Sequence, residues 1–129
     1  VQNVIREANQ TGHRVLLCIN GHLHMDFMRI YENVCYLDMN SASWDWMKET
    51  HDYFPPELAA QYNEITHTVI YNDPIHAIIT LTDDGTIEIE GMKSTFFMGV
   101  TREAASGNDF DHLVRTVPEV KSAKIKLFI

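Results

Sequence analysis

The feature that most constrains the fold is a nearly continuous apolar run at Arg14–Ile19. Before it, apolar residues recur at helical spacing in Val1–Asn9, and Gly12 stands where helices commonly end. A run of this kind indicates a strand buried on both faces, as in parallel sheets covered by helices. Helix, short loop and buried strand form the second half of a β-α-β unit. We therefore expect a helix at Val1–Asn9, and a chain that begins inside an α/β fold as a piece of a longer protein.

The rest of the sequence is typical of antiparallel strands. Asp84-Gly85 is a strong tight-turn pair between two alternating segments, and Glu32-Asn33 is a weaker one. We expect a polar, aromatic loop at Asn40–Trp46 and a short helix at Pro56–Tyr62, with proline in its first turn. Arg102–Glu119 is polar and has no clear period. The expected strands are Met25–Tyr31, Val34–Met39, Thr66–Tyr71, His76–Thr82, Thr86–Glu90, Thr95–Val100 and Ala123–Phe128, the last an edge strand guarded by lysines.

These elements predict an α+β fold that is mostly β. A short helix–strand opening, taken from a truncated α/β sandwich, would precede a largely antiparallel β region. Residues 1–39 would be the end of the α/β core, and residues 40–129 a β-rich extension packed with it as one unit.

A Gly-His-x-His motif directly follows the first expected strand, at Gly21–His24. On an extended segment, His22 and His24 would project to the same side, about 6–7 Å apart. Two ring nitrogens so placed could approach one metal or two neighbouring metals, since paired hydrolytic metals lie about 3.5–4 Å apart. Gly21 would allow the sharp turn before them. We interpret His22 and His24 as metal ligands; the alternative is a surface turn that binds nothing.

The segment RVLLCINGHLHMD resembles the last conserved block of calcineurin-like metallophosphoesterases, a strand followed by GHxH. YLDMNSASWDW, YNDPIHAIITLTDDGTIEIEG and STFF are similar to the C-terminal β-rich part of bacterial phosphohydrolases in that superfamily. The resemblance covers most of residues 1–97. It implies that His22 holds one metal and His24 the other, in a dinuclear centre of Mn, Fe or Zn type that hydrolyses a phosphomonoester or phosphodiester.

The other blocks of that family are absent from this sequence. No DxH, GDxxD or GNH series occurs, so the bridging aspartate and the asparagine ligand that a two-metal mechanism needs are missing. We therefore expect a C-terminal portion of a phosphoesterase that contributes the GHxH block and is inactive alone. The alternative is a non-catalytic β-rich module for packing or partner binding, in which GHLH is incidental.

The net charge and the hydropathy of the chain limit the kinds of partner that we expect it to bind. The formal net charge of −8 argues against a nucleic-acid surface, which usually needs a basic patch. No apolar run approaches the roughly 18–20 residues of a membrane span. If the neighbouring strand of the β-α-β unit is missing, apolar surface around Val15–Ile19 is exposed, and we expect a homo-oligomer. Cys18 and Cys35 lie in apolar runs and are interpreted as small buried hydrophobes.

Several other side chains allow two interpretations. Asp26 either orients a histidine of the motif or is a solvated carboxylate at the start of a strand. The five remaining histidines have no ligand spacing and receive no role. Polar residues that either line a cleft or form turns are Asn40, Ser41 and Ser43. Aromatic residues that either form a substrate wall or pack in the core are Trp44, Trp46, Tyr53 and Phe54.

Overall fold

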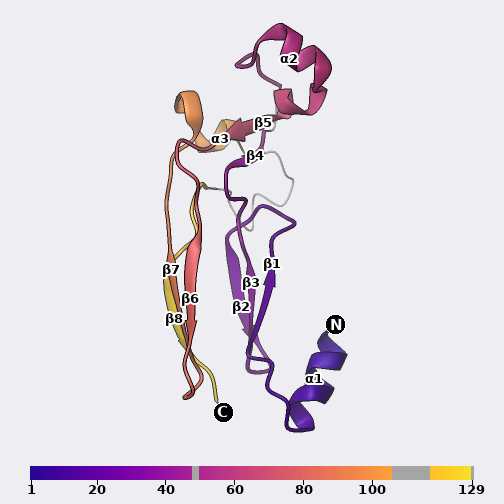
Figure 1. The fold of residues 1–129 in the computed structure, drawn as a ribbon, viewed down its shortest axis with the longest axis vertical. Helices are drawn as coiled ribbons and strands as arrows, with labels where there is room; N and C mark the ends of the chain where they lie inside the picture. Colours follow the sequence, from indigo (N-terminus) through magenta and orange to yellow (C-terminus); the bar gives the residue numbers. More distant parts are fainter. Residues whose placement is uncertain (48–49, 106–116, 129) are drawn as a thin grey trace.

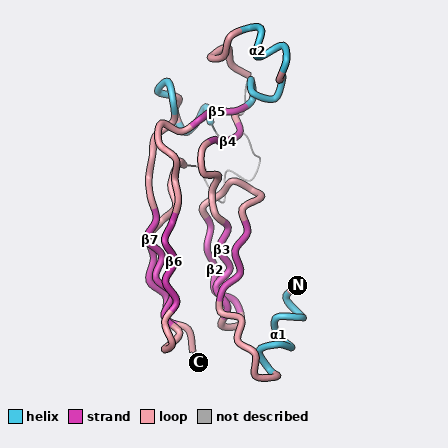
Figure 2. Tube along the Cα trace, in the orientation of Figure 1, coloured by secondary structure: helices cyan, strands magenta, loops and turns pink. Residues whose placement is uncertain are grey.

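The fold is mostly β with a few short helices, as the sequence predicted (Figures 1 and 2). The computed structural model describes residues 1–47, 50–105 and 117–128. In order, the elements are α1 (Gln2–Gln10), β1 (Leu17–Asn20), β2 (Phe27–Tyr31), β3 (Val34–Asp38), β4 (Trp44–Trp46), α2 (Pro56–Gln61), the 3-10 helix η1 (Asn63–His67), β5 (Thr68–Ile70), β6 (Ala77–Leu81), β7 (Thr86–Gly91), the 3-10 helix η2 (Phe97–Gly99), α3 (Arg102–Ala105) and β8 (Ala123–Lys126). Within these residues, no helix has the length and apolar character needed to cross a membrane.

The first sheet has the strand order β1-β3-β2. β1 and β3 are parallel, whereas β2 and β3 form an antiparallel hairpin. Its two turn residues, Glu32 and Asn33, both have positive φ angles, 48° and 59°. Left-handed conformations at both central positions define a type I′ turn, whose twist matches that of the flanking strands. The predicted hairpin is confirmed. Arg6 of α1 forms an ion pair with Glu32 at 2.8 Å and so ties the helix to this turn.

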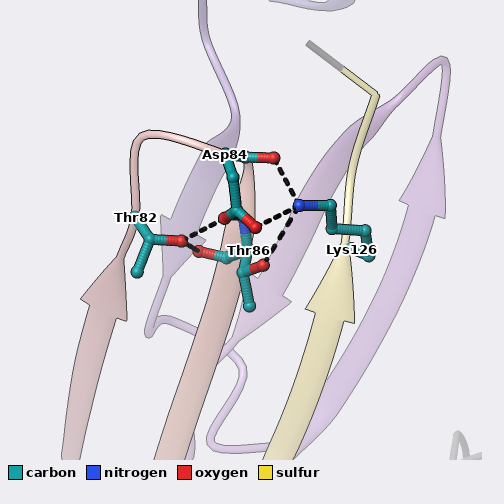
Figure 3. A network of polar contacts seen from close by, with 4 residues as sticks. All are labelled: Thr82, Asp84, Thr86 and Lys126. Carbon is teal, nitrogen blue, oxygen red and sulfur yellow. Dashed lines mark hydrogen bonds and ion pairs between the residues drawn. The ribbon is translucent and has the colours of Figure 1, made fainter.

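The second sheet has the order β6-β7-β8, and all of its pairs are antiparallel. The predicted β6–β7 hairpin closes at Asp84-Gly85, where Gly85 has a φ of 83°. Figure 3 shows the polar network at this turn. The Asp84 carboxylate accepts hydrogen bonds from the Thr82 hydroxyl (2.5 Å) and from the ammonium of Lys126, which also donates to the Asp84 carbonyl (2.7 Å). β8 is thus an edge strand, as predicted, and its Lys126 is fixed to the hairpin turn.

The two three-stranded sheets face each other, and a buried cluster fills the space between them (Figure 1). Because side chains alternate along a strand, each sheet sends every second residue into this cluster. It therefore joins the part of the chain before residue 40 to the part after it. The buried members are Cys35 and Leu37 on β3, Ile87 and Ile89 on β7, Ile125 on β8 and Leu127 just after it.

A second buried cluster lies at the end of the molecule where β4 pairs with β5. The chain around Gly91 comes so close to the residues before β8 that a Cβ at this position would lie 1.8 Å from the Val120 carbonyl oxygen. Met92 accepts a hydrogen bond there from the Val120 backbone N–H at 2.8 Å. The buried members of this cluster are Met47, Val69, Tyr71, Ile75, Phe96, Ala105 and Val120.

The prediction for Arg14–Ile19 is wrong in one respect. A strand forms, but β1 begins at Leu17 and is not buried on both faces: its last two residues are exposed, with 55% of Ile19 accessible. The reason is that β1 pairs with β3 on one side, and no strand of the described chain pairs with its other edge. The expected exposure of apolar surface near this strand is therefore present at Ile19.

Two further predictions about local structure are wrong. The expected loop Asn40–Trp46 contains β4, which exists because it pairs with the distant β5. The expected strand Thr95–Val100 is a bridge at Phe96 followed by η2, in which Met98 has a φ of 56°. The polar segment from Arg102 begins with the short helix α3, and its residues 106–116 lie outside the described residues.

Candidate functional site

The Gly21–His24 motif lies in the loop from β1 to β2, at the carboxyl end of a strand that runs parallel to its neighbour. Asn20 organises this loop. Its side-chain amide donates to Asp38 on β3 at 2.6 Å, and its side-chain oxygen accepts from the backbone N–H of His22 at 3.2 Å. Ligands of α/β sheets usually bind at this end of the strands. The loop position is therefore the one that the sequence predicted.

The conformation of the loop differs from the prediction. His24 has a φ of 53°, and residues 22 and 23 form a bend, so the segment is not extended. The alternation argument that projected His22 and His24 to one side therefore does not apply. Gly21 is also not required by the backbone, because its φ is not positive and an added Cβ would lie 3.9 Å from the Met39 carbonyl oxygen, an ordinary contact.

The two histidines have different surroundings. His22 is exposed, whereas His24 is half-buried among aromatic rings. Its imidazole lies edge-on against Trp44, with ring centroids 4.4 Å apart and an interplanar angle of 81°. It is nearly parallel to the ring of Trp46 at 6.5 Å, and the two tryptophans meet edge-on at 4.8 Å. β4 therefore holds one of the two predicted ligands.

This environment favours the neutral imidazole of His24. Burial lowers its pKa, and the nearby positive charge of protonated His22 lowers it further. The Nδ1 atom of His24 is buried and has no hydrogen-bond partner. A buried ring nitrogen without a partner is unusual, because most buried polar atoms form a hydrogen bond. A neutral imidazole nitrogen is also the form that binds metals, so His24 fits the role of a ligand.

The described residues supply only part of a metal site. In residues 1–47, 50–105 and 117–128, no group of three or more His, Cys, Asp or Glu side chains is placed to hold a metal ion. Catalytic zinc sites use three protein ligands, and two-metal sites use more. His22 and His24 therefore do not form a complete metal site with the other described residues.

Neither interpretation of Asp26 is correct. Its side chain is only 8% exposed, and it accepts a hydrogen bond from the backbone N–H of Lys121 at 3.2 Å, with the Lys121 ammonium at 3.6 Å. Burial raises the pKa of this carboxyl, and Lys121 opposes that shift. Asp26 thus attaches the start of β2 to the residues before β8. A sequence cannot show this contact, because it joins positions 95 residues apart.

The polar residues after β3 have a structural role. The Asn40 side chain is buried; its amide donates to the Val117 carbonyl at 2.5 Å, and its oxygen accepts from the Tyr71 hydroxyl at 3.0 Å and from the Ser41 backbone N–H at 2.7 Å. The Ser41 hydroxyl accepts from the Trp44 backbone N–H at 3.4 Å. These bonds form the turn that leads into β4, so the turn-forming interpretation fits Asn40 and Ser41. At Ser43 the backbone carbonyl, and not the side chain, accepts a hydrogen bond from the Tyr71 backbone N–H at 2.8 Å.

The four aromatic residues form two groups and not one wall. Trp44 and Trp46 pack with His24, whereas Tyr53 and Phe54 pack with His51 at centroid distances of 4.3 and 5.5 Å. His51 is structural: its Nδ1 accepts from the Tyr53 backbone N–H at 3.2 Å, and its Nε2 lies 2.5 Å from the Thr68 carbonyl oxygen.

Asp45 is the residue that the sequence interpretation missed. It lies on β4 between the two tryptophans and is 2% exposed. Its Oδ1 accepts from the Trp46 backbone N–H at 2.7 Å, while its Oδ2 is buried without a hydrogen-bond partner. Burial raises the pKa of this carboxyl to about 7. The only signal of this residue in the sequence was an aspartate between two large aromatic residues. The same pattern is typical of a strand that exposes one face to solvent.

The two cysteines are free and lie on opposite faces of the first sheet. Cys35 points into the cluster between the sheets, and burial raises the pKa of its thiol. Cys18 is half-buried and pairs in register with Tyr36, the residue after Cys35. The buried interpretation holds fully for Cys35 and in part for Cys18.

No protein-family model, curated protein or solved structure matches this chain.

Proposed function

We propose that this chain is the C-terminal portion of a metal-dependent phosphoesterase. In this proposal His22 and His24 contribute to a dinuclear centre of Mn, Fe or Zn type, which hydrolyses a phosphomonoester or phosphodiester. The observation that carries the proposal is the buried Nδ1 of His24, which has no hydrogen-bond partner and belongs to a ring whose neutral form is favoured. A bound divalent cation would supply the missing partner.

The position of the loop supports the proposal. It follows the carboxyl end of β1 and is fixed by Asn20. When bound, a pair of divalent metals lowers the pKa of a water molecule and neutralises charge on the phosphoryl oxygens. The chain's own contribution is to bind and orient. Trp44 and Trp46 fix the His24 ring and exclude water from one side of it, while exposed His22 adds a second donor nearby.

The remaining ligands would come from outside the described residues, because these hold no group of three suitable side chains. We therefore expect the chain alone to have no appreciable phosphatase activity with added manganese or zinc. Turnover that disappears in His22→Ala would contradict this expectation, since it would mean that the chain holds a complete site.

A second candidate function is a non-catalytic packing or partner-binding module. The observation in its favour is the ring packing of His24 with two tryptophans, which gives this histidine a structural use without any metal. Aromatic contacts of this kind stabilise a fold by about 0.5–1.5 kcal/mol per pair.

Metal titration separates the two candidates. We would add Mn²⁺ to the chain and follow the ring signals of the histidines by NMR, because this paramagnetic ion broadens signals close to it. We expect the signals of His22 and His24 to broaden first, and binding to weaken at least tenfold in His22→Gln and in His24→Gln.

His76→Gln is the matched control, because His76 is exposed and is far from the Gly21–His24 motif in the sequence. It should leave the broadening of His22 and His24 unchanged. Broadening of His76 at the same Mn²⁺ concentration as His24 would rule out a preformed pair of donors and favour the packing module.

A further inference from the structure

β4 has two faces that contact different parts of the molecule. Trp44 and Trp46 are two residues apart and lie on the same face, where their rings contact His24. Asp45, between them, points to the opposite face and is 2% exposed. One three-residue strand therefore connects the Gly21–His24 loop to a carboxyl group in the interior.

The carboxyl of Asp45 is incompletely paired. Its Oδ1 accepts from the Trp46 backbone N–H at 2.7 Å, and its Oδ2 has no hydrogen-bond partner. A buried carboxylate needs several donors to replace the water that it loses, and a neutral carboxyl group needs fewer. The hydrogen bond that Asp45 accepts comes from the backbone N–H of Trp46, so the strength of that bond depends on the charge of Asp45.

Among the described residues, few ionisable groups surround Asp45. The residues of β5 carry no charge, and Tyr71, just after β5, is the titratable group whose pKa the Asp45 charge raises. The Tyr71 hydroxyl donates to Asn40, not to Asp45. The other elements of this core carry Glu119 beside Val120 and Arg102 on α3; neither contributes to the shift at Asp45, which arises from burial and is opposed by the Trp46 N–H.

We propose that Asp45 is a positioning residue: when its carboxyl loses or gains a proton, β4 moves, and the two tryptophan rings that hold His24 move with it. The proton is exchanged with solvent, and the negative charge stays on the carboxylate. The charged form draws the Trp46 N–H closer or admits water, and either change displaces Trp46. The raised pKa of about 7 places this change near neutral pH. This proposal does not depend on the proposed phosphoesterase function, because the coupling between Asp45 and His24 acts whether or not His24 binds a metal.

The chain offers a direct probe of this coupling, because Trp44 and Trp46 are its only tryptophans. Intrinsic fluorescence therefore reports on β4 alone. We expect the fluorescence of the wild-type chain to change between pH 5 and 9 with a midpoint near 7. Asp45→Asn should abolish this transition, because the amide has similar shape and no titrating proton. His24→Gln should retain it, which excludes quenching by protonated His24 as its cause. A transition that persists unchanged in Asp45→Asn would overturn the proposal.

Two NMR measurements on the wild-type chain test the proposal even if Asp45→Asn fails to fold. The ¹³C signal of the Asp45 carboxyl should titrate near pH 7, and the Trp46 backbone amide signal should shift with the same midpoint. Nuclear Overhauser contacts between the rings of His24 and Trp44 should weaken across that range. A carboxyl that titrates near pH 4, or ring contacts that stay constant while it titrates, would overturn the proposal.

Discussion

The imidazole of His24 lies edge-on against the indole of Trp44, with ring centroids 4.4 Å apart. This contact explains why the two histidines of the motif differ. Burial lowers the pKa of His24, whereas His22 remains exposed to water. The contact also shows that β4, a strand absent from the sequence interpretation, helps to determine the chemistry of the Gly21–His24 loop.

Replacement of Trp44 by alanine should raise the pKa of His24 toward its ordinary value. The substitution admits water beside the ring, and burial is the larger of the two causes that lower this pKa. The measurement is an NMR titration of the His24 ring protons. Tyr53→Ala is the control, since Tyr53 stacks on His51 in the separate aromatic group; it should leave the His24 titration unchanged. An equal His24 pKa in wild type and Trp44→Ala would show that Trp44 does not shield the ring.

Alanine substitutions at two glycines should have different effects on the stability of the chain. In Gly91→Ala the new methyl group would lie 1.8 Å from the Val120 carbonyl oxygen, a backbone atom that can move only if β7 and the segment before β8 separate. We expect a loss of at least about 2 kcal/mol in the free energy of unfolding, measured by urea denaturation. Gly21→Ala should be neutral or slightly stabilising, because its nearest contact is 3.9 Å. Equal losses at the two positions would contradict this reasoning.

Local signals predicted the hairpins well, and long-range contacts explain the failures. Asp84-Gly85 and Glu32-Asn33 specify tight turns through their own backbone conformations, and both hairpins form. β4 was missed because three residues form a strand only where β5, over twenty residues later, pairs with them. For the same reason, composition could not show the burial of Asp45.

The candidate site was predictable in part. The motif and its position after a strand could be identified from the sequence, because apolar runs and Gly-His-x-His spacing are local. The left-handed conformation of His24 could not, since this backbone region is uncommon for residues other than glycine. Its aromatic neighbours come from β4, so the orphaned Nδ1 and the lowered pKa depend on a tertiary contact.

We expect the chain to form homo-oligomers through β1. β8 carries Lys124 and Lys126 at its edge of the second sheet, whereas β1 carries no charged residue and exposes Ile19. Charged side chains on an edge strand oppose pairing with other chains, and uncharged apolar edges permit it. Light scattering at high concentration should detect a dimer or larger species. Ile19→Lys should shift it to the monomer. Ile78→Lys tests β6, which is also an uncharged edge strand with an exposed isoleucine, and should leave the oligomer intact if β1 forms the interface. A monomeric wild-type chain would contradict this expectation.

The stability of the chain should carry a pH dependence that Asp45→Asn removes. In the folded chain the Asp45 pKa is raised from 3.8 to about 7, so this carboxyl keeps its proton over a range in which the unfolded chain has lost it. Between these values the folded state binds more protons. The contribution of Asp45 is therefore fully present below about pH 4 and is lost as the pH rises to 7. Three pKa units correspond to roughly 4 kcal/mol.

Urea denaturation between pH 4.5 and 8.5 measures this difference. The free energy of unfolding of Asp45→Asn minus that of wild type should increase as the pH rises to about 7 and then stay level. Asp84→Asn is the control. The pKa of Asp84 is shifted in the opposite direction, because Lys126 lowers it, so the contribution of Asp84 to stability is constant above about pH 5 and the difference between Asp84→Asn and wild type should not change with pH there. If the Asp45→Asn difference were the same at pH 5 and pH 8, the buried carboxyl would already be charged at pH 5. The Oδ2 of Asp45 would then have a donor in solution, and β4 would be open to water on the face that packs against Val69 and Tyr71.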